Sequence, residues 1–293
     1  MSGHQTLAGR VAIVTGASQG LGREIAHRFA LEGATVVICA RDRAMLEHVR
    51  EELAAGLDGS GRIVAKTLDV SDANAVQRLV AESAALSGSI DILVNSAGVY
   101  GPMGPIEDID WEEWVRTLEI NLFGSVMMCR AVVPVMKKAR RGKIVQLSGG
   151  GATNPMPNLS AYAASKAAIV RFAETLAMEV RPFGIDVNAL APGALNTRML
   201  DEVLAAGPQK VGADFHARAQ RQKASGGAGL EPGAELALFL ASDASNGITG
   251  KLISALWDAW PDWPAQAEAL DASDAFTLRR LAGRDRGLPW ADR

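Results

Sequence analysis

The sequence predicts an α/β protein, a single domain built on a doubly wound parallel sheet and followed by a C-terminal extension. Short β-branched runs alternate with helical stretches as far as about residue 256. The first such run, 10–15, leads directly into the glycine-rich turn 16–22. Small and polar residues follow the ends of the later runs, and parallel sheets bind their ligands at those ends. These observations together favour a sheet with helices on both faces.

Composition and charge narrow the class of protein. The 293 residues are 48% hydrophobic, which suits one large domain, 1–256, with an extension over 257–293. A net charge of -3 and a pI of about 5.9 give no electrostatic signature of a nucleic-acid or membrane partner. Cys39 and Cys129 lie in apolar runs without metal-ligand spacing, so no metal site is expected. Without an apolar leader or a run of about 18 apolar residues, we expect a cytoplasmic protein.

The turn after the first strand has the pattern of a dinucleotide site. Its glycines permit a tight turn and the close approach of a pyrophosphate, which the N–H groups of the next helix, about 23–31, can hold. A bare glycine pattern is weak, but its place between a strand and a helix makes the prediction strong. The expected cofactor-binding residues here are Gly16, Ser18, Gln19, Gly20, Leu21 and Gly22.

The second strand, 35–39, indicates which dinucleotide binds. An acidic residue at the strand tip would bind the adenosine ribose, but Ala40 lies there and Arg41 follows. An arginine at this place accommodates a 2′-phosphate, so NADP(H) is favoured and NAD(H) remains possible. An ordinary solvated charge is the alternative for Arg41.

Further candidates follow the later strands. Asp69, after the strand 63–68, meets either the adenine amino group or the N-terminus of the next helix. Asn121 lies inside the apolar helix 115–138 and is either a structural hydrogen-bonder or part of the site. The remaining cofactor-binding candidates at strand ends are Val70, Asn95, Ala97, Gly98, Pro192, Gly193 and Thr197.

Tyr162 and Lys166 form the candidate acid/base pair. Positions four apart on a helix share one face, so a phenol and an ammonium are presented to the same small volume. A nearby cation favours phenolate, which brings the tyrosine pKa closer to neutral pH. The strand 143–147 ends just before this helix, at Ser148 and the three glycines 149–151.

In this order, the motifs resemble those of the short-chain dehydrogenase/reductase family, which has a Rossmann-like fold, over about residues 7–255. They are Thr15-Gly-Ala-Ser-Gln-Gly-Leu-Gly22, Asp69, Asn95-Ser-Ala-Gly98, Asn121, Ser148, Tyr162-Ala-Ala-Ser-Lys166 and Pro192-Gly-Ala-Leu-Asn-Thr197. The resemblance implies that Tyr162 exchanges the proton, and that Lys166 lowers the Tyr162 pKa and binds the nicotinamide ribose.

Other roles come from the same resemblance. Ser148 would bind the substrate oxygen, and Asn121 would hold Lys166 through a water relay. Asp69 and Asn95 would line the adenosine side, while Thr197 would meet the nicotinamide end. The implied activity is that of an NADP(H)-preferring alcohol dehydrogenase or carbonyl reductase acting on a small secondary alcohol or ketone. A homo-oligomer is also implied, with a tetramer favoured over a dimer.

Two alternatives to this activity remain. A nucleotide-binding regulatory protein of the same fold would keep the cofactor site without the chemistry. A nucleotide-sugar epimerase or dehydratase would use related Tyr and Lys chemistry, although it needs a larger substrate domain than this chain offers.

The chain departs from the family pattern in three places. Ser96 stands where an asparagine is usual, and the position thirteen before Tyr162, the usual serine, is Gly149. We expect a one-residue insertion in the glycine run that brings Ser148 to the site, with Thr153 and Ser160 as weaker substitutes. The 257–293 extension carries four of the six tryptophans and is expected to cap the pocket, clasp another subunit or pack in the core. The 198–230 region is expected to be a mobile substrate loop.

Overall fold

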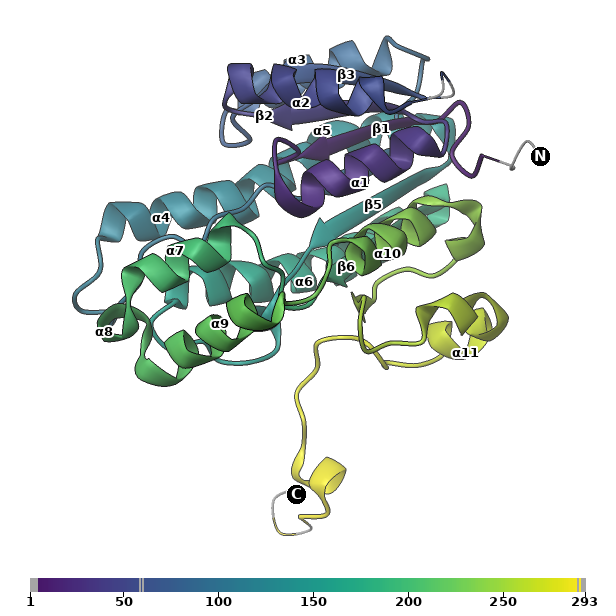
Figure 1. Ribbon diagram of the computed structural model, residues 1–293. Coiled ribbons are helices and arrows are strands. Elements are labelled where there is room, and N and C mark those ends of the chain that lie inside the picture. The colour runs from purple at the N-terminus through teal and green to yellow at the C-terminus, as the bar shows by residue number, and fades with distance from the viewer. Residues whose placement is uncertain (1–4, 58, 60, 289, 291–293) are drawn as a thin grey trace.

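A seven-stranded parallel sheet forms the centre of the molecule, with strand order β3-β2-β1-β4-β5-β6-β7 (Figure 1). The computed structural model describes residues 5–57, 59, 61–288 and 290. Chain order reverses between β1 and β4, which creates the crevice where open α/β sheets bind ligands. The strands are β1 (Val11–Thr15), β2 (Thr35–Ala40), β3 (Arg62–Thr67), β4 (Ile92–Asn95), β5 (Gly142–Leu147), β6 (Ile185–Ala191) and β7 (Leu252–Ser254).

Helices cover both faces of the sheet. One buried apolar cluster joins the sheet to α1 (Gly20–Leu31), α2 (Arg43–Ala55) and α10 (Glu231–Ala241). A second cluster joins the other face to α3 (Ala73–Ala84), α5 (Ser125–Ala139) and α6 (Ser160–Val180). Central strands such as β1 are buried along their whole length, which explains their continuous apolar runs. The predicted fold class is therefore confirmed.

Helix caps settle one of the open alternatives. The Asp42 side chain accepts a hydrogen bond from the Met45 N–H at the start of α2. At the start of α3, Asp72 accepts from the N–H groups of Asn74 and Ala75. Because Asp72 caps α3, Asp69 is not the capping residue of this helix.

The predicted helix 115–138 is longer than expected and is not uniform. It comprises α4 (Trp111–Leu118), a π-helical segment η1 (Glu119–Gly124) and α5. The stretch Trp111–Ala139 is long and apolar enough to cross a membrane, as the buried core helices of other proteins also are. Its side chains Met128, Val132 and Met136 are fully buried against the sheet, so we describe it as a core helix.

The region expected to be a mobile loop is mostly helical. It forms α7 (Arg198–Ala206), α8 (Pro208–Val211) and α9 (Ala213–Ser225), which we call the cap. Leu200, Val203, Val211 and Ala219 give the cap a small buried core of its own. This core packs against Tyr100 and Met103 of the main domain, and the mobility of the cap stays a prediction.

The first part of the C-terminal extension packs on the domain. It contains η5 (Trp260–Gln266) and α11 (Ala267–Asp271), and the side chain of Trp263 is 6% exposed. The chain then passes the edge strand β7, where Leu252 N–H donates to the Phe276 carbonyl oxygen at 2.7 Å. Core packing therefore accounts for Trp263, and the edge of the sheet is covered by the chain itself.

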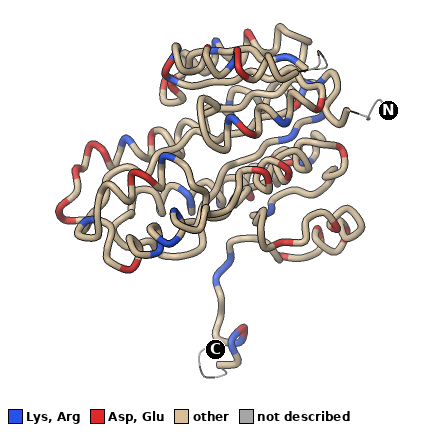
Figure 2. The backbone as a smooth tube through the Cα atoms, viewed as in Figure 1, with Lys and Arg blue, Asp and Glu red and all other residues tan. Residues whose placement is uncertain are grey.

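Other short elements complete the chain. They are the 3-10 turns η2 (Gly150–Ala152), η3 (Arg181–Phe183), η4 (Asp243–Ser245) and η6 (Gly283–Arg286). Figure 2 shows acidic and basic residues interspersed along the outer helices.

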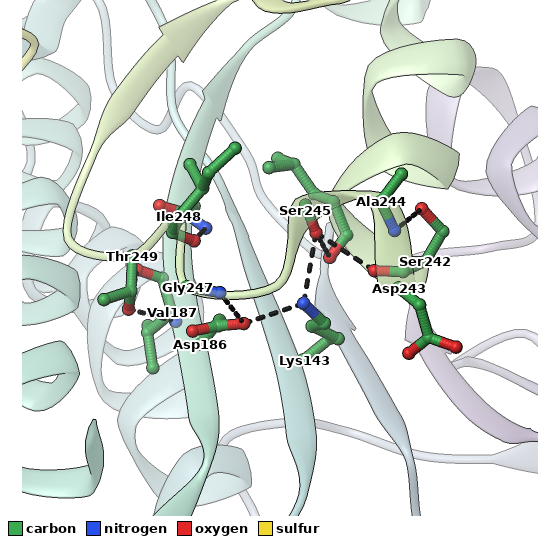
Figure 3. A network of polar contacts seen from close by, with 12 residues as sticks. Lys143, Asp186, Val187, Ser242, Asp243, Ala244, Ser245, Gly247, Ile248 and Thr249 are labelled. Atoms are coloured by element: carbon green, nitrogen blue, oxygen red, sulfur yellow. Dashed lines mark hydrogen bonds and ion pairs between the residues drawn. The ribbon is translucent and has the colours of Figure 1, made fainter. Parts of the chain in front are cut away.

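A buried polar network joins the amino ends of β5 and β6 to η4 (Figure 3). The Lys143 ammonium donates to Asp186 Oδ2 at 2.7 Å and to Ser245 Oγ at 3.2 Å. Burial lowers the Lys143 pKa, against the attraction of Asp186. Because the network lies at the opposite end of the strands from the crevice, its role is structural.

Candidate active site

A cavity of about 1580 Å³ opens at the carboxyl ends of the strands. It exceeds the roughly 300–1,000 Å³ of most small-ligand pockets, as a site for a dinucleotide plus a substrate must. All the predicted site residues except Asn95 and Asn121 line it. They are Gly16, Ser18, Gln19, Gly20, Leu21, Gly22, Arg41, Asp69, Val70, Ala97, Gly98, Ser148, Tyr162, Lys166, Pro192, Gly193 and Thr197.

The glycine turn after β1 is held against the turn after β4. Thr15 Oγ1 accepts hydrogen bonds from the N–H groups of Ser96 and Ala97, each at 3.1 Å. A Cβ on Gly16 would lie 2.7 Å from Ala97 Cα, and one on Gly22 would lie 2.6 Å from the Gly16 carbonyl oxygen. Side chains are therefore excluded at both glycines by backbone contact, which keeps the turn tight.

Gly20 marks the start of α1 and has a φ of +56°, a conformation that favours glycine. A Cβ there would lie 3.5 Å from the Thr197 methyl group, so the turn after β1 faces the turn after β6. The N-terminus of α1 opens between them, and its free N–H groups and dipole suit a pyrophosphate.

Arg41 and Asp69 line the cavity at the ends of β2 and β3. Arg41 is exposed and forms no ion pair with any residue in the described part of the chain. The Asp69 carboxylate accepts from Ser71 N–H and Oγ–H and pairs with Arg116 at 2.8 Å. Burial opposes ionisation of Asp69, but the bonds from Ser71 and Arg116 outweigh it and hold its pKa below the ordinary value. Asp69 is thus an ionised acceptor.

Asn95 does not line the cavity, which corrects the predicted cofactor contact. Its side chain is buried and directs its amide nitrogen to the Ser125 carbonyl oxygen at 3.4 Å and to Cys129 Sγ at 3.5 Å. Asn95 is the last residue of β4, where alternate side chains point to opposite faces, and it points to α5. The cavity wall is made instead by the next residues, Ser96 to Gly98.

Asn121 clamps the backbone at the cavity edge. Its amide oxygen accepts from Val99 N–H at 2.9 Å, and its amide nitrogen donates to the Val99 carbonyl oxygen at 2.9 Å and to Ser165 Oγ at 3.0 Å. A Cβ on Gly98 would lie 3.3 Å from the Asn121 amide oxygen and 3.7 Å from Lys166 Nζ. Asn121 is therefore a structural hydrogen-bonder that also borders the site, and the water relay stays a prediction.

The acid/base pair lies at the centre of the cavity wall. Burial, and then the nearby Tyr100, raise the Tyr162 pKa well above its ordinary value. Burial lowers the Lys166 pKa to about 8. The Lys166 ammonium donates to the Leu147 carbonyl oxygen at 2.7 Å and lies 5.7 Å from the centre of the Tyr162 ring. The shift of Tyr162 is opposite to the expected one, because burial and Tyr100 both raise its pKa.

The residue that faces the Tyr162 hydroxyl is Gly149, since a Cβ built there would collide with the phenol oxygen. The expected one-residue shift that turns Ser148 toward the phenol is not seen. The Ser148 hydroxyl is buried without a hydrogen-bond partner among the described residues. Of the two substitutes, Thr153 lines the cavity, while Ser160 Oγ lies 3.1 Å from the Trp114 indole nitrogen, away from it.

Several lining residues were missed by sequence reasoning. Tyr100 is foremost, and its ring meets that of Tyr162 edge-on, with 4.7 Å between centroids. Its position two residues after the Gly98 turn was an available signal. The other missed residues include Asn154, Met156, Phe215, Arg218, Gln222 and Trp257. Phe215, Arg218 and Gln222 share one face of α9, but that face was not recognised because the segment was expected to be a loop.

Comparison with known proteins agrees with this geometry. The family model for short chain dehydrogenase matches residues 10–207. The human protein "Dehydrogenase/reductase SDR family member 4" is 40% identical over 198 residues, which are 67% of this chain and 70% of that protein.

Two solved structures are similar over most of this chain. A candidate NAD(P)-dependent gluconate 5-dehydrogenase from Beutenbergia cavernae, with NADP bound at low occupancy, has a TM-score of 0.75 and 34% identity. The match covers 86% of this chain and 97% of that one. An NAD+-bound xylitol dehydrogenase has a TM-score of 0.76 and 28% identity, with 85% and 98% covered. The chain therefore belongs to the short-chain dehydrogenase/reductase family of NAD(P)-dependent oxidoreductases.

Proposed function

We propose that this protein is an NADP(H)-preferring alcohol dehydrogenase or carbonyl reductase that interconverts a small secondary alcohol and its ketone. The observation that carries the proposal is the meeting of Tyr162 and Lys166 in one cavity with the glycine turn of β1. The residues present fit a dinucleotide: backbone contact excludes side chains at Gly16 and Gly22, and the N-terminus of α1 is open. Arg41, exposed at the adenosine side, supports the choice of NADP(H).

When bound, the cofactor supplies or accepts the hydride at the nicotinamide. The protein supplies the proton. In reduction, the substrate carbon gains the hydride, and the Tyr162 hydroxyl gives its proton to the substrate oxygen. The raised pKa of Tyr162 keeps this hydroxyl protonated at neutral pH. The Lys166 ammonium, held by the Leu147 carbonyl, stabilises the phenolate that remains.

In oxidation the same steps run backward, and the Tyr162 phenolate accepts the alcohol proton. Burial disfavours this phenolate, so the free site holds the protonated hydroxyl from which reduction starts. Asn121 is a positioning residue, because it fixes the Val99 backbone beside Tyr162 and Lys166.

The proposal is tested by following NADPH absorbance with a panel of small ketones, using wild type and Tyr162→Phe. We expect turnover by wild type and loss of nearly all of it in Tyr162→Phe, with NADPH still bound. Equal NADPH binding with no turnover by wild type would support the regulatory alternative. Conversion of a nucleotide sugar without net NADPH consumption would support the epimerase or dehydratase.

A further inference from the structure

Tyr162 is one clear hydrogen-bond donor to a substrate oxygen in this site, and a second donor would assist the reaction. A carbonyl oxygen has two lone pairs, and a second donor binds it more tightly as negative charge develops during hydride transfer. Position 149 provides no side chain and has no room for one beside the Tyr162 hydroxyl. Ser148, the residue predicted from sequence, precedes that position, and its hydroxyl makes no hydrogen bond to Tyr162 or to any other described residue.

Tyr100 is the other tyrosine of the chain, and it shares the cavity with Tyr162. The two rings meet edge-on, with centroids 4.7 Å apart and planes at 63°. Both side chains line the same cavity, and the hydrogen bonds of the described residues engage neither phenol hydroxyl. Two phenol donors, carried by rings that are in contact, therefore remain available to a ligand.

Three separate contacts hold Tyr100 in place. Asn121 binds both the N–H and the carbonyl oxygen of Val99, which fixes the backbone immediately before Tyr100. Tyr162 packs against one side of its ring. The core of the cap packs against Tyr100 as well, through a cluster that includes Leu200 and Val203. Such support is what a donor needs if it is to be oriented before the reaction starts.

We infer that Tyr100 donates a second hydrogen bond to the reacting oxygen beside Tyr162. The Tyr100 ring also contacts both the core of the cap and the Tyr162 ring. The inference rests on the proposed function. No proton is transferred from Tyr100: the hydride goes to carbon, the Tyr162 proton goes to oxygen, and the Tyr100 hydroxyl remains a donor throughout. Burial, and then Glu202, raise the Tyr100 pKa, which keeps this hydroxyl protonated at neutral pH.

The test uses Tyr100→Phe in the full chain, because phenylalanine keeps the ring contacts with Tyr162 and the cap while removing the hydroxyl. We expect kcat/KM for ketone reduction to fall by about 10²–10³-fold, the range for loss of one such donor. The loss should lie mainly in kcat, while NADPH affinity and the melting temperature stay close to wild type. Ser148→Ala and Thr153→Val test the other two hydroxyls that line the cavity, and each should lower kcat/KM less than Tyr100→Phe does.

The outcomes separate this inference from the proposed function. If wild type reduces ketones and Tyr162→Phe does not, the proposed function stands, and Tyr100→Phe with full activity overturns the inference. A large loss in Ser148→Ala or Thr153→Val with full activity in Tyr100→Phe assigns the second donor to that residue instead. A fall in melting temperature and NADPH affinity that accompanies the loss in Tyr100→Phe also overturns it, because the hydroxyl would then be structural.

Discussion

At the scale of single residues, burial shifts the pKa values of the two catalytic candidates in opposite directions. Tyr162 is held toward its neutral phenol and Lys166 toward its neutral amine, because each charged form loses hydration in the cavity wall. The lysine pKa of about 8 still leaves most of the side chain charged at neutral pH. The pair is therefore set as a protonated phenol beside an ammonium, the state from which a carbonyl is reduced.

The pH dependence of reduction should report Lys166. Below its pKa of about 8 the ammonium is present and stabilises the phenolate formed in the reaction, and above it this stabilisation is lost. We therefore expect kcat/KM for reduction to be level near neutral pH and to fall as the pH rises through about 8. Initial rates with a good ketone across this range measure the profile.

Lys166→Arg provides the control for this profile, because an arginine stays charged throughout. If this variant keeps activity, its kcat/KM should not fall as the pH rises through about 8. A wild-type rate that stays level far above it contradicts the assignment.

Arg41→Asp should change cofactor choice. The substitution removes a charge-assisted hydrogen bond to a 2′-phosphate, worth about 1.5–3 kcal/mol, and puts a like charge in its place. NADPH affinity should thus fall by about ten-fold or more, while NADH affinity changes little. Fluorescence titration with each cofactor gives the ratio. Arg43→Asp is the matched control, since Arg43 is also exposed but does not line the cavity.

The sequence placed the site residues along the chain well, but it did not show which way each side chain faces. The glycine turn, Arg41, Asp69, Tyr162 and Lys166 all line the cavity as predicted. Their patterns are local, so a strand-turn-helix reading was enough to find them. Asn95, Ser148 and Tyr100 were misjudged or missed because the twist at a strand end decides whether a residue or its neighbour reaches the cavity.

At the scale of elements, three-dimensional packing changed what local sequence had indicated. The cap was expected to be a loop from the family resemblance and from Gly207-Pro208 and the glycines after Ser225. In the structure these residues only separate or end helices. The helices are held by apolar contacts to Leu200 and Val203, which sequence periodicity does not reveal over so short a span. The π-helical segment around Asn121 was not predicted either, because six residues are too short a span for sequence periodicity to reveal it.

Lys251 should anchor the C-terminal extension to the edge of the sheet. Its buried ammonium donates to the carbonyl oxygens of Ser273 at 2.8 Å and Ala275 at 3.1 Å. Lys251→Met fills the space but leaves both carbonyls without this donor, which should cost about 1–3 kcal/mol of unfolding free energy. Urea denaturation measures the change. Lys138→Met, at an exposed site on α5, is the control and should leave the unfolding free energy nearly unchanged. Equal stability of the two variants would show that the Lys251 amine does not anchor the extension.

At the scale of the whole molecule, the extension divides into a docked part and an arm. Glu174 accepts a hydrogen bond from the Leu278 N–H at 2.6 Å, and this is the last firm contact with the domain before the arm, residues 279–288. In Figure 1 the chain then runs away from the sheet and carries η6 apart from it. Leu281 and Leu288 on the arm are 55% and 41% exposed, and Trp290 beyond it is 81% exposed. Exposed apolar side chains on a projecting arm favour contact with another subunit.

We therefore predict a homo-oligomer in which the arm contributes to assembly. The chain covers its own β7 edge at Phe276, so we do not expect this edge to pair with another subunit. Met178 on α6, 79% exposed, and Phe123, 50% exposed, are the apolar side chains that a partner subunit would cover on the helical side. A chain ending at Leu278 keeps the hydrogen bond from Leu278 to Glu174, although it loses the ion pair between Arg279 and Asp274. This shorter chain should assemble to a smaller size than wild type. Light scattering at micromolar concentration measures the masses of both chains. A monomeric wild type would refute the oligomer. An equal number of subunits for the two chains would exclude the arm from the interface and leave the helical surface as the site of assembly.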